Sequence, residues 1–132
     1  MSSSPAETSA PRISAIDLFC GAGGLSLGLR QAGVRVEAGI DLDPACAYPY
    51  RSNVGAEFIR ADVSDVVGQD LRDRWAPDSI RLLAGCAPCQ PFSSQRRGAD
   101  TREEKGWGLL THFGRLIGET APELVKIGRA HV

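Results

Sequence analysis

Two cysteines and two prolines follow a short apolar run in the second half of the chain. The run 82–85 (LLAG) has the composition of a buried strand, and the segment 86–93 (CAPCQPFS) comes directly after it. In an open α/β sheet, ligands and reacting groups gather beyond the carboxyl ends of the strands. A cysteine there, on a loop stiffened by the fixed φ of Pro88 and Pro91, is placed like a nucleophile.

The C-x-x-C spacing of Cys86 and Cys89 also fits a redox dithiol or half of a zinc site. A redox pair usually opens a helix, whereas Pro91 and a long polar loop follow here. Zinc needs two further ligands. The other two cysteines, Cys20 and Cys46, lie in other predicted elements. The chain has only two histidines, His112 and His131. Both alternatives are therefore disfavoured, and we expect no metal.

Short apolar runs alternate with helical patterns along the chain. The runs that predict strands are 12–19, 34–40, 57–60 and 78–85, and a fifth begins at 122–125. Helices are predicted from Leu25 to Gly33, from the N-cap Asp43 toward Asn53, and over 107–120. Strands that alternate with helices at this spacing predict an α/β fold with a doubly wound parallel sheet.

Three strand ends carry residues typical of a nucleoside pocket. The turn 21–24 (GAGG) lets a ligand approach the backbone closely, while Asp41 and Asp62 end the second and third strands. The dinucleotide fingerprint is absent, because Ser26 stands where its third glycine is needed, so S-adenosylmethionine fits better than NAD. The alternative for each feature is local, namely a tight turn without ligand and aspartates that cap helices or turns.

The composition excludes several classes of protein. The chain has 132 residues, a net charge of −1, 42% hydrophobic and 23% charged residues, which is ordinary soluble-globular usage. No apolar run approaches the roughly 18 residues that span a bilayer, so we expect no membrane partner. Residues 1–12 are predicted to be a disordered leader without the features of a signal peptide. Free thiols in a reducing cytoplasm are therefore expected.

Four blocks resemble, in order, the opening half of a cytosine-C5 DNA methyltransferase. They are 17–24 (DLFCGAGG), 41–43 (DLD), 62–63 (DV) and the highly specific 88–93 (PCQPFS). The resemblance covers about residues 13–125 and implies a Rossmann-like, S-adenosylmethionine-dependent methyltransferase sheet, truncated near strand five. It also implies S-adenosyl-L-methionine as cofactor, double-stranded DNA as substrate, and a location in the bacterial cytoplasm or nucleoid. A cognate restriction endonuclease is a candidate partner.

The resemblance also assigns roles to individual residues. Cys89 is the expected catalytic nucleophile, adding covalently to a cytosine flipped out of the duplex, with Gln90 and Ser93 near the DNA. Asp41 would bind the ribose, Leu42 would cover the adenine, and Asp62 with Val63 would hold the adenine edge. The full set expected to bind cofactor is Phe19, Gly21, Gly23, Gly24, Leu25, Asp41, Leu42, Asp62, Val63, Pro88 and Leu109.

Three other functions stay open on the sequence alone. Relatives that methylate cytosine in tRNA share the same blocks, and the recognition region that would decide between them is missing. A non-catalytic nucleoside-binding α/β module would use the pocket but not Cys89. An NAD-binding oxidoreductase is the least favoured, because Ser26 stands where the dinucleotide fingerprint needs its third glycine.

The end of the sequence departs from the resemblance. Strand five should lead into a Glu-Asn-Val motif, which is absent, as are the later arginine-bearing motif and the target-recognition region. Residues 126–132 (KIGRAHV) abandon the apolar pattern, and IGRAHV is similar to one reading frame of a common sequencing adapter. We therefore hypothesise that native sequence ends near Val125 and that 126–132 is a non-native tail, the alternative being an ordinary polar tail. Such a chain is predicted to be an inactive fragment.

Overall fold

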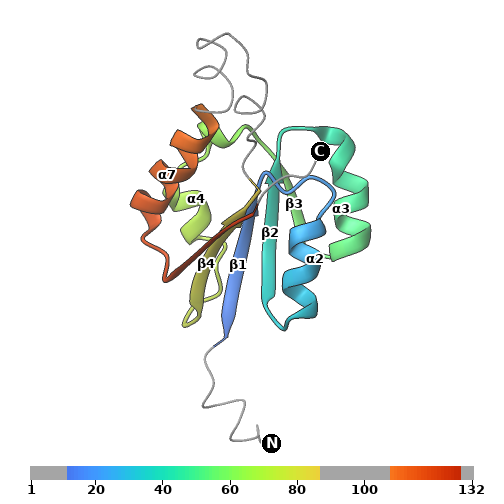
Figure 1. Ribbon diagram of the computed structural model, residues 1–132, viewed down its shortest axis with the longest axis horizontal. Helices are drawn as coiled ribbons and strands as arrows, with labels where there is room; N and C mark the ends of the chain where they lie inside the picture. The colour runs from blue at the N-terminus through green and yellow to red at the C-terminus, as the bar shows by residue number, and fades with distance from the viewer. Residues whose placement is uncertain (1–11, 87–107, 129–132) are drawn as a thin grey trace, which may run out of the picture.

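A five-stranded parallel sheet organises the chain, with the strand order β3-β2-β1-β4-β5 (Figure 1). The computed structural model describes residues 12–86 and 108–128. The strands are β1 (Ile13–Leu18), β2 (Arg35–Asp41), β3 (Glu57–Arg60), β4 (Ile80–Gly85) and β5 (Leu124–Ile127). The helices are α2 (Gly24–Gln31), α3 (Ala47–Val54), α4 (Gly68–Arg72) and α7 (Gly108–Thr120), with two 3₁₀ turns, η1 (Pro44–Cys46) and η2 (Val63–Asp65). The predicted doubly wound α/β fold is confirmed.

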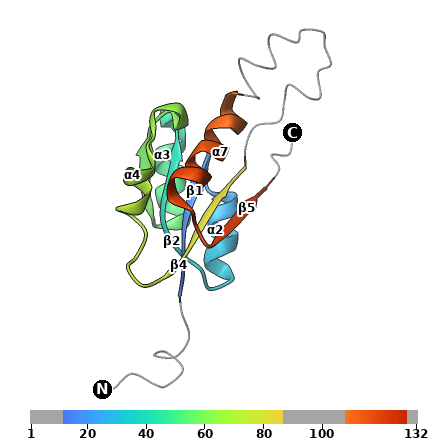
Figure 2. The ribbon, with the colours of Figure 1, turned by 90° about the vertical axis from the view of Figure 1, so that its left-hand side faces the viewer.

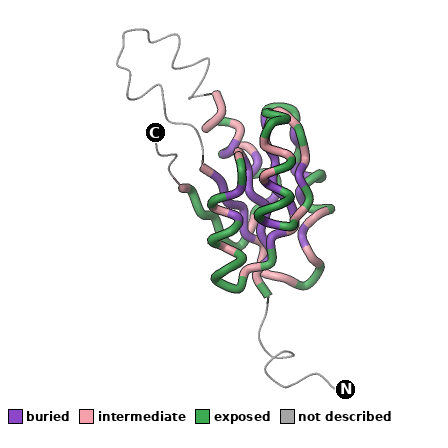
Figure 3. The backbone as a smooth tube through the Cα atoms, turned by 90° about the vertical axis from the view of Figure 1, so that its right-hand side faces the viewer, coloured by how far each residue is buried: buried purple, intermediate pink, exposed green. Residues whose placement is uncertain are grey.

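Helices cover the sheet in two layers. α2 and α3 lie against one face, and α4 and α7 lie against the other, as Figures 1 and 2 show. Side chains alternate along each strand, so that Ile16 and Leu18 of β1 join the core under α4 and α7, whereas Ala15 joins the core under α2 and α3. Both faces are therefore apolar, and the buried strands run between helices with exposed outer surfaces (Figure 3).

Several element boundaries differ from the sequence predictions, and backbone conformation explains two of them. Phe19 has φ 56 and Asp78 has φ 61, so neither residue can extend its neighbouring strand. β1 therefore ends at Leu18, and β4 begins at Ile80. The short helix α4 was not predicted, because its 5 residues carry too little periodicity to stand out.

The last strand extends beyond the predicted end of the native sequence. Lys126 and Ile127 pair with Ala84 and Gly85 of β4. Two residues of the predicted tail thus lie in the sheet, and the proposed origin of that tail stays a prediction. β5 occupies an edge of the described sheet, and each of its side chains is exposed. The predicted polar loop 87–105 and Trp107 lie outside the described residues.

Within the described ranges, no helix has the length and apolarity needed to cross a membrane.

We expect Gly39→Ala to destabilise the fold by about 2 kcal/mol, as overpacking of a filled core does. A Cβ at Gly39 would stand 2.4 Å from the ring of Tyr50, which is fully buried and cannot swing away. Gly28→Ala is the matched control, because a Cβ on that residue of α2 meets nothing within 4 Å. Urea unfolding of the three proteins measures the effect, and equal stability of the Gly39 and Gly28 variants would contradict the packing described here.

Candidate functional site

The carboxyl ends of the five parallel strands meet at one edge of the sheet, at the top of Figure 1. β1, β2 and β3 are direct neighbours, so the segments after Leu18, Asp41 and Arg60 lie side by side. The backbone joins them further. The Cys20 amide donates to the Ile40 carbonyl at 3.0 Å, and the Ala61 amide donates to the Asp41 carbonyl at 3.1 Å. The three predicted pocket segments are thus brought together.

Asp41 ties the glycine turn to the end of β2. One carboxylate oxygen, Oδ2, accepts from the Gly21 amide at 2.9 Å, and the other, Oδ1, accepts from the Asp43 amide at 3.0 Å. Each oxygen keeps a lone pair beyond these bonds. The carboxylate is half-buried at the edge of the sheet and therefore has the position and the acceptor capacity to bind a hydroxyl group.

The glycines of the turn 21–24 differ in what a Cβ at each position would meet. A Cβ at Gly21 (φ 55) or Gly24 would meet nothing within 4 Å, so these two residues border open space. Gly23 (φ 103) instead backs onto α3, where a Cβ would stand 2.6 Å from Val54 and 3.0 Å from Tyr50. Gly23 is also the N-cap of α2. Its need for glycine is thus explained by packing, whereas Gly21 and Gly24 leave room for a ligand.

Asp62 and Val63 form the corresponding corner after β3. The Asp62 carboxylate caps η2 by accepting from the Ser64 amide at 3.0 Å and the Ser64 hydroxyl at 2.8 Å. These hydrogen bonds lower the pKa of Asp62. Both bonds fall on Oδ1, so among the described residues Oδ2 has no partner. The side chain of Val63 is buried in the core and fixes the turn from below.

Apolar side chains complete this edge. Leu42 is 56% exposed directly after Asp41, so its side chain offers an apolar surface at this edge. Phe19 adopts the left-handed region that a bulky residue rarely occupies, and its ring stacks on Phe113 of α7 with centroids 6.4 Å apart. Leu25 and Leu109 are half-buried in the first turns of α2 and α7.

A buried polar chain that the sequence analysis missed lies beneath the glycine turn. The Ser26 hydroxyl donates to Asp17 Oδ2 at 2.6 Å, and the Tyr50 hydroxyl lies 2.8 Å from the same Ser26 oxygen. Asp17, Ser26 and Tyr50 belong to β1, α2 and α3, and all three are buried. Burial raises the pKa of Asp17 to about 6, although the Ser26 hydrogen bond opposes the shift. The sequence signal for this polar chain was Asp17, a single aspartate within an otherwise mainly apolar strand.

None of the three described thiols is an activated nucleophile. Cys20, Cys46 and Cys86 are free, and burial raises the pKa of each, so each stays a thiol near neutral pH. Cys86 directly follows β4, and its sulfur would lie 2.9 Å from a Cβ at Gly128. The predicted nucleophile Cys89, together with Pro88, Gln90 and Ser93, lies outside the described residues.

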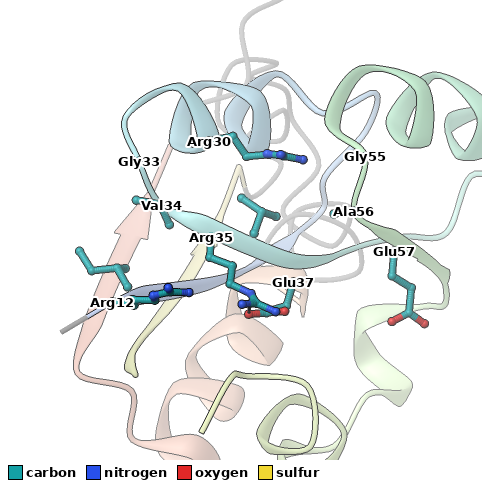
Figure 4. A pocket seen from close by; sticks show the side chains of 11 residues that line it. Arg12, Arg30, Gly33, Val34, Arg35, Glu37, Gly55, Ala56 and Glu57 are labelled. Atoms are coloured by element: carbon teal, nitrogen blue, oxygen red, sulfur yellow. Dashed lines mark ion pairs between the residues drawn. The ribbon is translucent and has the colours of Figure 1, made fainter. Parts of the chain in front are cut away.

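A cleft of about 610 Å³ lies at the opposite, amino-terminal edge of the sheet (Figure 4). Two of the three arginines that line it are engaged in the fold. Arg35 pairs with Glu37 at 2.9 Å, and Arg30 donates to the Val54 carbonyl at the end of α3. Because α2 and α3 both end at this cleft, their carbonyl groups disfavour an anion there. We therefore assign the candidate site to the carboxyl edge alone.

A comparison with known protein families identifies the family of the chain that carries this edge. The model of the C-5 cytosine-specific DNA methylase family matches residues 13–127. The chain belongs to this family.

Curated relatives and solved structures agree with this methylase assignment. The Type II methylase M.HgiDII of Herpetosiphon aurantiacus is 44% identical over 112 residues, which are 85% of this chain and 31% of the relative. The Type II methyltransferase M.XorII of Xanthomonas oryzae is 39% identical over 114 residues, 82% of this chain and 26% of its own length. A crystal structure described as a DNA modification methyltransferase encoded within a prophage (E. coli) has a TM-score of 0.67 and 29% identity, covering 88% of this chain and 32% of that one.

The chain thus spans about a third or less of the length of these relatives. Its described candidate residues Phe19, Gly21, Gly24, Asp41, Leu42, Asp62 and Val63 gather at one edge of the sheet, as the sequence predicts. Gly23 and Leu25 stand behind that edge at the start of α2, and Leu109 stands in the first turn of α7. Their contacts with a cofactor stay predictions.

We expect Asp17 to make the stability of this chain depend on pH in the acid range. The folded-state pKa is raised from 3.8 to about 6, so the folded chain holds a proton more tightly than the unfolded one. The stability contributed by Asp17 is therefore full below about pH 4 and is lost as the pH rises through about 6. Urea unfolding between those pH values should show this fall in the wild type and not in Asp17→Asn.

The control is Tyr50→Phe. This change removes the hydroxyl that hydrogen-bonds Ser26 at the other end of the buried polar chain but keeps the Asp17 carboxyl. That variant should be less stable at every pH and still show the fall. A difference between wild type and Asp17→Asn that does not change with pH would refute the assignment.

Proposed function

We propose that this chain is the cofactor-binding and nucleophile-bearing part of a DNA (cytosine-5-)-methyltransferase that uses S-adenosyl-L-methionine. The observation that carries the proposal is the joining of three strand-end segments through Asp41, in a chain of the cytosine-specific methylase family. Gly21, Asp41 and Asp62 stand at or just beyond the ends of adjacent strands and present open backbone, a carboxylate at the end of β2 and a carboxylate after β3.

These residues fit the chemical groups of S-adenosylmethionine. The Asp41 carboxylate would accept from the ribose hydroxyls, as the strand-two carboxylate does in nucleoside-binding α/β folds. The exposed Leu42 would pack on the adenine, whose exocyclic amino group matches the unused Oδ2 of Asp62. Phe19, Gly24 and Leu25 would line the remaining wall, with Gly23 supporting it and Pro88 and Leu109 closing it. When bound, the cofactor supplies an electrophilic methyl group.

Cys89 is proposed to make the cytosine reactive. Its thiolate would add to C6 of the ring, which turns C5 into an enamine-like carbon nucleophile. After C5 has been methylated, loss of the C5 proton restores the double bond and expels the cysteine. C6 is hidden in a duplex, so the base has to be flipped out of double-stranded DNA, with Gln90 and Ser93 beside it. The raised pKa values of Cys20, Cys46 and Cys86 support the choice of Cys89 as nucleophile.

We propose that the 132 residues alone do not methylate DNA. The chain covers 31% and 26% of its curated relatives, and its sequence contains no Glu-Asn-Val motif to hold the flipped cytosine. The proposed activity therefore belongs to a longer protein that contains this segment. Two of the relatives are named Type II enzymes, which supports a cognate restriction endonuclease as a candidate partner.

Asp41→Asn should weaken the binding of S-adenosylmethionine about tenfold, the loss typical of one charged hydrogen bond. An amide at this position has a single acceptor oxygen, whereas the carboxylate serves the Gly21 and Asp43 amides and the ribose together. Isothermal titration of the 132-residue chain measures the binding. Asp43→Asn is the matched control, because asparagine keeps the cap on the Ala45 amide and affinity should not change. Binding of NAD instead of S-adenosylmethionine would contradict the cofactor assignment.

Cys89→Ser should abolish covalent capture of a 5-fluorocytosine duplex when the segment is expressed with its natural continuation. Fluorine cannot leave C5 as a proton does, so the wild-type adduct is trapped and visible on a denaturing gel. Cys86→Ser is the control and should still be captured. The 132-residue chain should form no adduct and transfer no methyl group. Methyl transfer by that chain, or capture of the Cys89→Ser protein, would overturn the proposal.

A further inference from the structure

We propose that Arg115 is a positioning residue that sets the selectivity of the site for adenine. It acts on the adenine turn, defined here as residues 62–65, which lies at the proposed cofactor edge. The inference rests on the proposed function, because the turn is expected to meet the adenine edge there. Arg115 stands on α7, which is 43 or more residues away in the sequence from this turn, and only the fold brings them together.

The guanidinium group of Arg115 uses each of its nitrogens. Nη2 donates to the Val63 carbonyl at 3.2 Å, Nη1 donates to Glu119 Oε2 at 3.1 Å, and Nε donates to His112 Nδ1 at 3.1 Å. Its partners on α7 are one turn away on either side, so they hold the planar fork in place. The side chain is 28% exposed, and its bond to Val63 is partly shielded from water.

The Val63 carbonyl is the atom through which Arg115 of α7 contacts the adenine turn. It accepts both the Val66 amide at 3.1 Å and Arg115, while the Val63 side chain is buried in the core. Within residues 12–86 and 108–128, Asp62 does not tie the turn to another element, because its bound oxygen accepts from Ser64 of the same turn. Together with the buried Val63 side chain, Arg115 therefore fixes the position of the exposed atoms of the turn, and it does so from α7.

The helix that carries Arg115 is itself fastened to the segment after the turn. Glu119 accepts from the Gly68 amide through Oε1 at 2.7 Å while its other oxygen holds Arg115. Arg72 of α4 donates to the Glu119 carbonyl. α7, α4 and η2 thus form one polar assembly, and the link to the carbonyl within the adenine turn is made by Arg115.

The test compares two ligands that differ only at the purine edge. S-adenosylhomocysteine carries an amino group there, and S-inosylhomocysteine carries a carbonyl oxygen. Isothermal titration of the 132-residue chain with each gives a selectivity ratio. In Arg115→Met the ratio should fall about fivefold, the factor expected for one lost hydrogen bond. Arg72→Met is the matched control, because it removes an arginine bound to α7 and leaves Val63 untouched, so the ratio should stay at the wild-type value.

A merely structural role would weaken both ligands equally and leave the ratio unchanged, which would overturn the proposal. Arg115→Lys, which keeps one donor, should retain more of the ratio than Arg115→Met. Amide hydrogen exchange on the unliganded chain gives an independent measure, with faster exchange expected at Ser64, Asp65 and Val66 in Arg115→Met. If the wild type bound neither ligand, the proposed function and the adenine selectivity would both fail, and unchanged exchange would in addition refute the anchoring.

Discussion

The buried hydroxyl of Tyr50 is the contact on which the site depends most. It meets Ser26 from α2, which in turn holds Asp17 of β1, so one polar chain ties the central strand to both helices of its layer. The ring occupies the space over Gly39 and behind Gly23. A larger residue at either glycine would displace the helix and with it the turn 21–24. The open approach to the backbone at this edge is thus a consequence of packing several ångströms below it.

The acidic residues of the edge already hold local backbone amides, and the proposed function gives the same carboxylates a second role as binding groups. Asp41 holds the amides of Gly21 and Asp43, and Asp62 holds Ser64. On the sequence alone, a local cap and a ligand contact stood as alternatives. The first role would prepare the proposed second one, because a carboxylate that is already fixed by backbone amides loses little further freedom when it accepts a hydroxyl or an amino group.

Local signals in the sequence were sufficient for the elements and for the ends of the strands. The strand 57–60 and the cap at Asp43 before Pro44 are found as predicted, because each depends on residues within a few positions. Ser26, Tyr50 and Arg115 could not be found in this way. Their partners lie 9 to 52 residues away, and a serine, a tyrosine or an arginine on a helix has no spacing that distinguishes it from a surface residue. The role of Cys89 remains a prediction from its motif.

The conformation of Phe19 sets the strain of its backbone against the packing of its ring. A left-handed φ at a bulky aromatic residue costs on the order of 1–2 kcal/mol, which a glycine would not incur. Glycine would relieve that strain, but it would also remove the ring that stacks on Phe113 and packs against the core under α4 and α7, so glycine is expected to destabilise the fold. The packing of the ring thus offsets the strain of the backbone that carries it and holds the end of β1 against α7. Substitutions meant to stabilise this domain should therefore be sought at other positions and leave Phe19 with its strained φ in place.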